Sequence, residues 1–401
     1  METPNIQTAQ SQPRIVELDA LRGLAVIGIV WMNVYAFALP LQAYYNPIAY
    51  GGEGQFDRLI WAASFVFIED KFRTLFALLF GAGCLILLER AKERAWRAHF
   101  ARMAVLFAIG LVHSILLASN DVLRAYALAG LAIPFLAYLS SRALIAISLG
   151  LLGIHLGGGM VAFGSGVVDF YAGRMASDAS LFAERNYGSD SAALRYTLGL
   201  GAEDLGERVI RRSGNIPAQL QAIALSIPLN LAAMSLGMAL WKNRLLAGEW
   251  RVFKLQRVSA IAALFALPGL LMLAWWVAEN GFPGGLVGAA ALVVSAPFDM
   301  ALGFAYAALA MALFAAGGPV TDRLASVGRL SLSNYLMTSI ILASIFASWG
   351  LGLFGSVSRL GAFAFSFVPI GVMLLISPYW HKHVGQGPFE RLWRGLSSTL
   401  N

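Results

Sequence analysis

A histidine inside an apolar run, followed closely by an aspartate, is the strongest acid–base candidate in this sequence. His113 lies in the run Met103–Ala118, Asn120 and Asp121 form the turn behind it, and Tyr126 follows in the next run. Imidazole titrates near neutral pH, and a carboxylate can fix its tautomer and increase its basicity. We therefore predict catalytic roles for His113 and Asp121 and binding roles for Asn120 and Tyr126. The alternative is a histidine that only bonds a backbone carbonyl.

A second group of polar residues precedes the apolar run 74–88. Asp70, Lys71 and Arg73 are predicted to bind substrate, with the cations able to stabilise an oxyanion or hold an acidic acceptor. If residues 59–88 cross an apolar phase once, these charges lie near its middle and must line a polar cavity. If residues 59–68 form an interfacial helix instead, the cluster lies at the outer surface.

A third pair lies at the start of the chain. Arg22 precedes the first apolar run, and Asn33 follows eleven residues later. On a helix, Asn33 is about 16 Å deeper and within about 20° of the same face. We predict that Arg22 holds a phosphate at the mouth of a site and Asn33 a polar acyl group deeper in. The alternative is an anchoring arginine and an asparagine that bonds a neighbouring helix.

Other chemical motifs are weaker. His155 precedes a run of three glycines, where close packing explains it as well. His381 and His383 have a metal-binding spacing, but no cysteine or carboxylate nearby completes a site, so we predict no metal. No nucleotide-binding glycine loop is present in the sequence.

Composition indicates which elements must position these residues. Of the 401 residues, 58% are hydrophobic and only 13% are charged, and the mean hydropathy is +0.69. Soluble domains carry about 25% charged residues. The apolar residues form long continuous runs, so the sequence predicts an all-α polytopic membrane protein. The net charge of +7 comes from short loops rich in Lys and Arg, which indicates cytoplasmic loops and not nucleic-acid binding.

Charge and hydropathy together predict about ten crossings with both termini in the cytoplasm. Two of these crossings, within residues 59–88 and 285–316, are interrupted, so eleven or twelve remain open. Residues 1–13 are predicted to be a disordered cytoplasmic tail, and residues 14–401 a single transmembrane domain. A near-neutral segment at about 164–215 is predicted to be an extracytoplasmic insert.

Six short motifs occur in order along the chain. They are Leu18–Gly23 with Asn33, Lys71–Phe76 with Leu79–Gly83, Gly110–His113, Asp121–Leu123 with Tyr126–Leu128, Val327–Tyr335, and Gly387–Arg394. Together they resemble the YeiB-like bacterial membrane proteins, and the resemblance covers almost the whole chain. That family resembles the transmembrane acyltransferases, which include the acyltransferase-3 enzymes and heparan-alpha-glucosaminide N-acetyltransferase.

The resemblance implies a multi-pass protein of the bacterial inner membrane. It also implies transfer of an acyl group from cytoplasmic acyl-CoA, such as acetyl-CoA, to a hydroxyl or amine of a small molecule or saccharide outside. The chain departs from the acyltransferase-3 pattern, which places a histidine eleven residues after the arginine of the first span, where Asn33 stands here. It also has no histidine between Asn33 and Arg73, where the heparan enzyme has one. His113 is the substitute.

The alternative function is a transporter or exporter of a small amphipathic or anionic metabolite, in which the same charges line a permeation path. Besides the lipid bilayer, the expected partners are the acyl acceptor and no nucleic acid. The sequence leaves open whether the chain forms a homo-oligomer.

Overall fold

The computed structural model describes residues 15–90, 95–174 and 177–400, and every regular element in these ranges is a helix. Residues 1–13, predicted to be disordered, and part of the basic loop after Arg90 lie outside the described residues. The helices are α1 (Val16–Ala38), α2 (Leu41–Tyr45), α3 (Gln55–Phe67), α4 (Lys71–Arg90), α5 (Ala95–Leu116), α6 (Val122–Gly130), α7 (Ile133–Leu136), α8 (Ser141–Tyr171), α9 (Asp178–Tyr187), α10 (Ser191–Gly199), η1 (Leu200–Ala202), α11 (Leu205–Gly214), α12 (Ile216–Lys242), α13 (Val252–Glu279), α14 (Gly284–Ala289), η2 (Ala290–Val294), α15 (Ala296–Phe314), α16 (Pro319–Arg329), α17 (Ser331–Phe346), α18 (Arg359–Phe365), α19 (Phe367–His383) and α20 (Pro388–Thr399).

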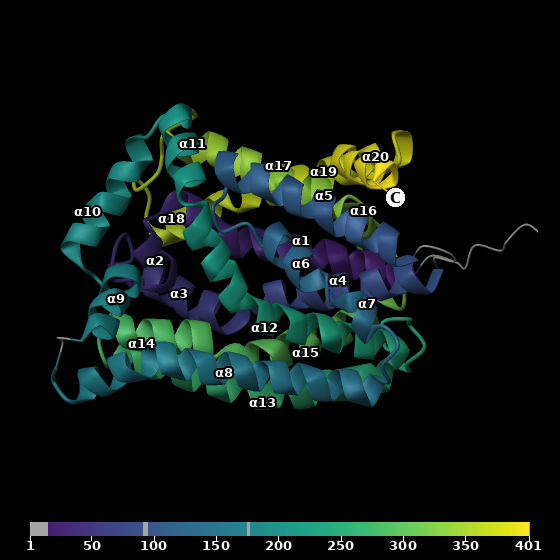
Figure 1. The fold of residues 1–401 in the computed structure, drawn as a ribbon, viewed down its shortest axis with the longest axis horizontal. Helices are drawn as coiled ribbons and strands as arrows, with labels where there is room; N and C mark the ends of the chain where they lie inside the picture. The colour runs from purple at the N-terminus through teal and green to yellow at the C-terminus, as the bar shows by residue number, and fades with distance from the viewer. Residues whose placement is uncertain (1–14, 91–94, 175–176, 401) are drawn as a thin grey trace, which may run out of the picture.

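The long helices run roughly side by side, as the prediction of a polytopic helical bundle requires (Figure 1). Among the described residues, eight helices are long and apolar enough to cross a membrane. A ninth span is added if α16 and α17, which are bent by 81° at their junction, cross as one unit. The stretch 55–90, with α3 and α4, counts as one of the eight.

The number of candidate spanning helices is lower than the predicted ten or so. One reason is that the crossing expected over Val122–Leu139 is divided into the short helices α6 and α7. Pro134 explains the break, because proline has no N–H to donate to the Gly130 carbonyl one turn earlier. The His99 ring donates to that carbonyl instead, from Nε2 at 2.8 Å. The segment is therefore too short in each part to count as a spanning helix by length.

Proline also explains the interruption expected within residues 285–316. Helix α14 continues through a π-helical turn, η2, into α15, and Pro297 lies in the first turn of α15. Because Pro297 cannot pair with the Val293 carbonyl, the hydrogen bonds shift, and Ser295 N bonds Ala290 O at 3.0 Å. Asp299, which is buried, lies in the first turn of α15, after this π-helical turn.

Helices α9, α10 and α11 occupy most of the segment predicted as an insert at 164–215, and they gather at the end of the bundle opposite the C-terminus (Figure 1). Helix α8 extends eight residues past the expected boundary, to Tyr171. Side chains following α1 hold the insert: Gln42 Nε2 donates to Arg185 O at 2.8 Å, and Asn46 Nδ2 donates to Tyr187 O at 2.9 Å. The insert is therefore attached to the bundle and covers one end of it.

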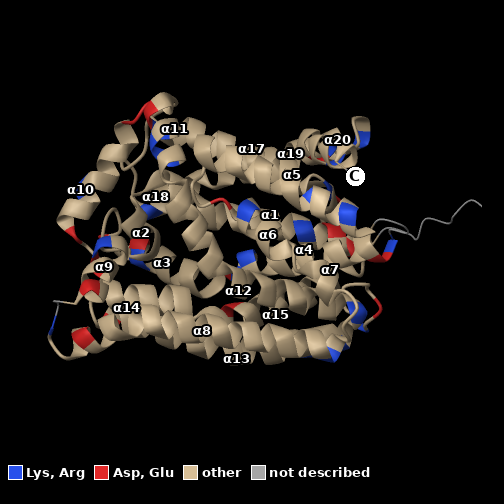
Figure 2. Cartoon of the chain, in the orientation of Figure 1, with Lys and Arg blue, Asp and Glu red and all other residues tan. Residues whose placement is uncertain are grey.

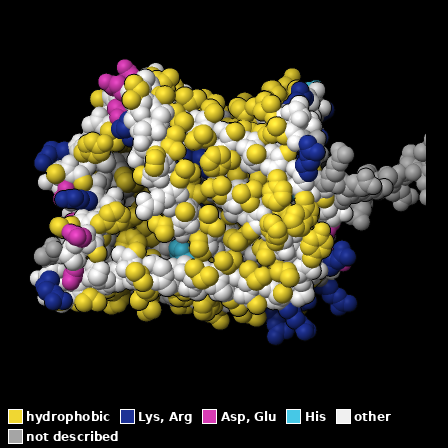
Figure 3. Space-filling view, in the orientation of Figure 1, with side chains coloured by type: hydrophobic (Ala, Val, Ile, Leu, Met, Phe, Trp, Pro, Cys, Tyr) yellow, Lys and Arg dark blue, Asp and Glu magenta, His cyan; other side chains and the backbone are white. Residues whose placement is uncertain are grey.

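Charged residues gather at the two ends of the bundle, and mainly apolar side chains cover the middle of the visible face (Figures 2 and 3). The end that carries the C-terminus is rich in Lys and Arg (Figure 2). The opposite end carries residues of both signs. This distribution is that expected of a multi-pass membrane protein.

Helices α4 and α12 approach each other closely through a pair of glycines. A Cβ added at Gly81 would fall inside van der Waals contact with the Met234 carbonyl, and one at Gly237 would do the same with the Leu78 carbonyl. Small residues allow such close packing of helices in a membrane. This contact fixes the position of α4, the helix that begins with the charged residues Lys71 and Arg73.

We expect Gly237→Ala to destabilise the protein by about 1–3 kcal/mol, because the added methyl must separate the two helices. Thermal unfolding of the purified protein in detergent measures the change. Gly157→Ala in α8 is the matched control, since nothing lies within 4 Å of a Cβ there, and alanine favours a helix by up to about 1 kcal/mol over glycine. Equal effects of the two substitutions would contradict this account of the packing.

Candidate functional site

The structure brings His113 and Asp121 together, as the sequence predicts. His113 lies near the end of α5, and its Nδ1 is 2.8 Å from Oδ1 of Asp121. Asp121 is the N-cap of α6, where its Oδ2 accepts from the backbone N–H of Arg124 at 3.0 Å. Both side chains are buried. A carboxylate can only accept, so Nδ1 carries the proton and the lone pair of His113 lies on Nε2.

Nε2 of His113 is buried and has no hydrogen-bond partner among the described residues. The ring is held in place on its other side by Asp121 and by Tyr335, whose ring centroid is 5.3 Å away. The Tyr335 hydroxyl donates to Asp121 Oδ1 at 3.3 Å. A fixed imidazole whose basic nitrogen is unpaired has the arrangement of a general base.

Gly110 allows this geometry. It lies one turn before His113 on the same face of α5, and an added Cβ would be 2.6 Å from Asp121 Oδ2 and 2.9 Å from Arg124 N. Any larger residue would push the N-terminus of α6 away from α5. The glycine of the Gly110–His113 motif is thus required by the close approach of the two helices.

Arg124 is a site residue that the sequence reasoning missed. Its side chain is 1% exposed, and Nη1 and Nη2 donate to Gln219 Oε1 at 2.7 Å and to Ser119 O at 3.0 Å. Its Nε is 3.7 Å from Asp121 Oδ2 and has no hydrogen-bond partner in the described part of the chain. Its position three residues after Asp121 was the only signal in the sequence.

The two predicted binding residues near His113 form no hydrogen bond with it in the described structure. Asn120 is exposed in the turn before α6, and no hydrogen bond joins it to His113 or Asp121 in the described structure. Tyr126 is buried, and its hydroxyl donates to Arg73 O at 2.8 Å. Tyr126 therefore connects α6 to the start of α4 and does not contact His113.

The charged cluster before α4 is inside the protein. Asp70, in the turn between α3 and α4, has φ of 58°, and its carboxylate pairs with Arg73 at 3.1 Å. The side chain of Lys71 is 1% exposed; its Nζ lies 2.7 Å from Asp299 Oδ1 and also donates to the Phe65 carbonyl. Asp70 and Lys71 are therefore enclosed by the protein and are not exposed on its surface.

Asp299 completes this cluster from a distant part of the chain. The sequence reasoning noted it only as an interruption of an apolar stretch. A lone carboxylate in an apolar run signals a partner elsewhere in the bundle, but the sequence could not indicate that the partner is Lys71. The charge of Lys71 is thus neutralised by Asp299, which leaves Arg73, with 27% of its side chain exposed, as the more accessible cation.

Arg22 and Asn33 lie at different levels of the bundle, as their spacing on α1 predicts. Arg22 pairs with Asp19 at 3.1 Å, and Asp19 also pairs with Arg329 of α16 at 3.1 Å. Asn33 is buried next to Met32, whose sulfur accepts from the backbone N–H of Asp70 at 3.4 Å. Asn33 therefore lies at the level of the charged cluster, and Arg22 near the end of the bundle that holds the C-terminus.

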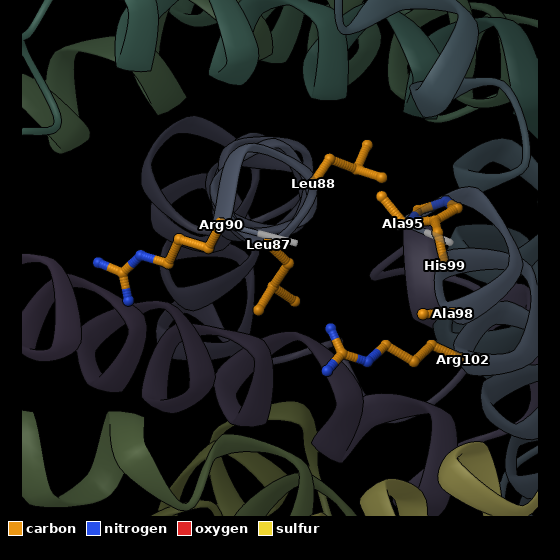
Figure 4. A pocket seen from close by; sticks show the side chains of 7 residues that line it. All are labelled: Leu87, Leu88, Arg90, Ala95, Ala98, His99 and Arg102. Carbon is orange, nitrogen blue, oxygen red and sulfur yellow. The ribbon is translucent and has the colours of Figure 1, made fainter. Parts of the chain in front are cut away.

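A cavity of about 240 Å³ lies at that same end, between α4 and α5. Figure 4 shows its lining, in which Arg102 extends towards Leu87 and Arg90 points away to the other side of α4. Arg22 lies one turn deeper, since its guanidinium is 3.3 Å from a Cβ placed on Gly83. The cavity is lined by Leu87, Leu88, Arg90, Ala95, Ala98, His99 and Arg102. This basic cavity can attract phosphate groups, but His113, Arg73 and Asn33 do not line it.

No group of three side chains suited to hold a metal ion occurs in the described ranges. In the predicted weak site at the end of α19, Nε2 of His381 lies 2.5 Å from Nη1 of Arg329. A guanidinium has no lone pair to offer, so Nε2 is the acceptor in this contact and its lone pair is engaged. His155 bonds the Leu292 carbonyl through Nε2 at 2.9 Å, which ties α8 to the π-helical turn.

Removing one partner of the buried Lys71–Asp299 pair is predicted to be costly. Lys71→Met leaves an unpaired carboxylate among apolar helices, and we expect a loss of about 3–5 kcal/mol in stability. The double variant Lys71→Met/Asp299→Leu removes both charges and should recover most of that loss. Thermal unfolding of the single and double variants measures this, and additive losses would exclude the pairing as the cause.

Comparison with known proteins agrees with the sequence motifs. Residues 240–399 match the family described as "Protein of unknown function (DUF418)". The chain is 32% identical over 403 residues to a protein of Escherichia coli K12 described as uncharacterized protein YeiB, covering 96% of each chain. It is 27% identical over 411 residues to the uncharacterized protein YxaH of Bacillus subtilis 168, covering 98% of this chain and 96% of that one. The chain belongs to the YeiB-like family of polytopic membrane proteins.

Proposed function

We propose that this protein transfers an acyl group from a coenzyme A thioester on one side of the membrane to a hydroxyl or amine on the other. The observation that carries the proposal is the buried His113–Asp121 pair with its unpaired Nε2. A transferase needs such a base to deprotonate the acceptor. The comparisons support the membrane family, and the acyl-transfer chemistry is our inference from the site.

The basic cavity supports a donor site at the end of the bundle with the C-terminus. Arg102, which extends towards Leu87 across the cavity, can pair with phosphates of the donor, and Arg22 lies one turn deeper. We propose that this end faces the cytoplasm of a bacterial cell, because Lys and Arg are concentrated there (Figure 2). A cytoplasmic donor would then enter from this side.

Helix α5 connects the donor cavity to the base. His99 lines the cavity and His113 is fourteen residues later on the same helix, a rise of about 21 Å. The acyl end of the donor would extend along α5 towards the opposite side. The insert with α9 to α11 would cover the acceptor entrance and influence which small molecule or saccharide is accepted.

In the proposed transfer, His113 first accepts a proton and later returns it. His113 Nε2 takes the proton of the acceptor O–H or N–H while the acceptor oxygen or nitrogen attacks the thioester carbonyl carbon. The C–S bond then breaks, and His113 returns the proton to the leaving thiolate. Asp121 holds the tautomer and stabilises the imidazolium that forms between these events. Arg124, which lies beside Asp121 and whose Nε has no hydrogen-bond partner among the described residues, is the cation that can stabilise developing negative charge. Lys71 and Arg73 instead pair with Asp299 and Asp70.

A transporter is the second candidate, and two breaks in the helices favour it. Asp70 lies in the turn between α3 and α4, and the π-helical turn η2 lies just before Asp299. The buried Lys71–Asp299 pair joins these two places. Interrupted helices that carry charges within the membrane are typical of transporters.

Removing the imidazole of His113 tests the proposed base. We expect His113→Ala to lower acyl-CoA hydrolysis or transfer by at least about 100-fold, because no other group would accept the proton. Release of free thiol by the purified protein measures the activity. His155→Ala is the control, since His155 bonds the Leu292 carbonyl of the π-helical turn η2 and not Asp121. Undiminished thiol release in His113→Ala, or substrate counterflow in proteoliposomes without covalent change, would refute the enzyme proposal.

Changing Arg102 tests the proposed binding site of the donor. Arg102→Gln should weaken binding of coenzyme A by about tenfold, since a charge-assisted hydrogen bond contributes about 1.5–3 kcal/mol. Isothermal titration of the purified protein with coenzyme A measures the affinity. Arg97→Gln, an exposed arginine on the same helix, should leave it unchanged. If both variants bind equally well, the basic cavity is not the donor site.

A further inference from the structure

A second cavity lies towards the other end of the bundle, between α1, α2, α3 and α18. It holds about 10 Å³, roughly the space for one water-sized group. We call it the outer cavity, and its wall includes Trp31, Tyr35, Tyr44, Ser64, Glu69 and Arg359. None of these residues contacts His113 or Asp121 through a hydrogen bond found in the described structure.

Three residues of this wall carry buried polar atoms without a hydrogen-bond partner in the described structure. They are Nε1 of Trp31, Oε1 of Glu69 and Nε of Arg359. Glu69 is 7% exposed and Arg359 is 1% exposed, so bulk water does not satisfy them. An unpaired buried polar atom costs about 1–3 kcal/mol, and three around one cavity indicate a missing partner.

The guanidinium of Arg359 is held in place by other contacts. Its Nη1 and Nη2 donate to the carbonyls of Ala43 at 2.6 Å and Tyr44 at 3.0 Å, and its carbon lies 4.2 Å from the centre of the Tyr35 ring. Tyr35 in turn bonds Ser64 across the cavity wall at 3.2 Å. The cavity is thus built of fixed side chains that come from four separate helices.

The unpaired atoms determine the chemistry of the missing partner. Trp31 Nε1 and Arg359 Nε need an acceptor, whereas the Glu69 carboxylate needs a donor. A hydroxyl group both accepts and donates. One neutral hydroxyl can therefore meet all three unpaired atoms.

The accessible side of the cavity indicates where the rest of the ligand lies. Of all the residues that line it, only Trp31 and Ile68 are partly exposed. Beside them, Phe67 is 48% exposed and Phe367 is 53% exposed, and the Trp31 and Phe367 rings are 6.5 Å apart. In a membrane these exposed aromatic side chains face lipid tails.

The position of the cavity along α1 agrees with a ligand that enters from the lipid side. Trp31 lies seven residues before the end of α1 at Ala38, about 10 Å from that end of the helix. We propose that the outer cavity binds the hydroxyl head of a neutral amphiphilic alcohol, whose apolar chain lies beside Phe67 and Phe367. This binding site is independent of acyl transfer at His113, and its test needs no coenzyme A.

The experiment measures stabilisation of the purified full-length protein by monoolein. The detergent is lauryldimethylamine oxide, because it has no hydroxyl group to compete for the cavity. We expect monoolein to raise the unfolding temperature in a saturable way, as a ligand that binds the folded state does. Glycerol, the same head without the chain, should require far higher concentrations.

Two variants test the residues. Glu69→Leu should abolish the monoolein effect, whereas Glu279→Leu, the same change at an exposed position, should retain it. Trp31→Phe keeps an aromatic ring and loses only the N–H, so its affinity should fall about fivefold to tenfold. If Glu69→Leu does not fold, Trp31→Phe alone tests whether monoolein binds in the outer cavity. Its control is Trp275→Phe, at an exposed tryptophan.

Each other outcome overturns the proposal. If neither monoolein nor glycerol shifts the unfolding temperature, the cavity holds only water. If glycerol acts at the same concentration as monoolein, the ligand is a soluble alcohol and not an amphiphile. An unchanged monoolein affinity in Trp31→Phe places the binding elsewhere on the protein.

Discussion

A charge enclosed by apolar helices must meet an opposite charge or a hydrogen-bond partner, since water cannot solvate it there. The interior of this protein is arranged around that constraint. Lys71 meets Asp299, Asp70 meets Arg73, and Asp121 accepts from both His113 and the first turn of α6. The Lys71–Asp299 pair joins α4 to α15, and the His113–Asp121 pair joins α5 to the N-terminus of α6, so polar contacts help to position these helices.

Some buried polar atoms have no such partner among the described residues, and we propose that the protein reacts or binds a ligand at two of these places. Nε2 of His113 is a basic nitrogen without a partner, while its other nitrogen is held by a carboxylate. Glu69, Arg359 and Trp31 leave three unpaired atoms around one small cavity. In contrast, His99, His155 and His381 all have hydrogen-bond partners, and His99 bonds the Gly130 carbonyl, to which Pro134 has no N–H to donate.

The basic cavity and His113 lie at different positions along the bundle, and the function we propose depends on this separation. The basic cavity is near the end of the bundle with the C-terminus, whereas His113 lies fourteen residues after His99 on the same helix. A protein that passes a group across a membrane needs this arrangement, with a donor site at one side and a base at the other. Helix α5 carries residues of both sites and so couples them within one rigid element.

The sequence by itself determined the class of this protein, because long apolar runs with few charges can only be stable as membrane-spanning helices. It also predicted the His113–Asp121 pair, since a short turn between two helices brings residues eight apart into contact. It did not predict that Lys71 pairs with Asp299 or that Glu69 and Arg359 line one cavity, because Asp299 and Arg359 are hundreds of residues away. It also did not predict that Asp19 pairs with both Arg22 and Arg329. Only the tertiary structure decided these contacts, because pairing between distant helices depends on which of them pack together, and hydropathy does not specify that.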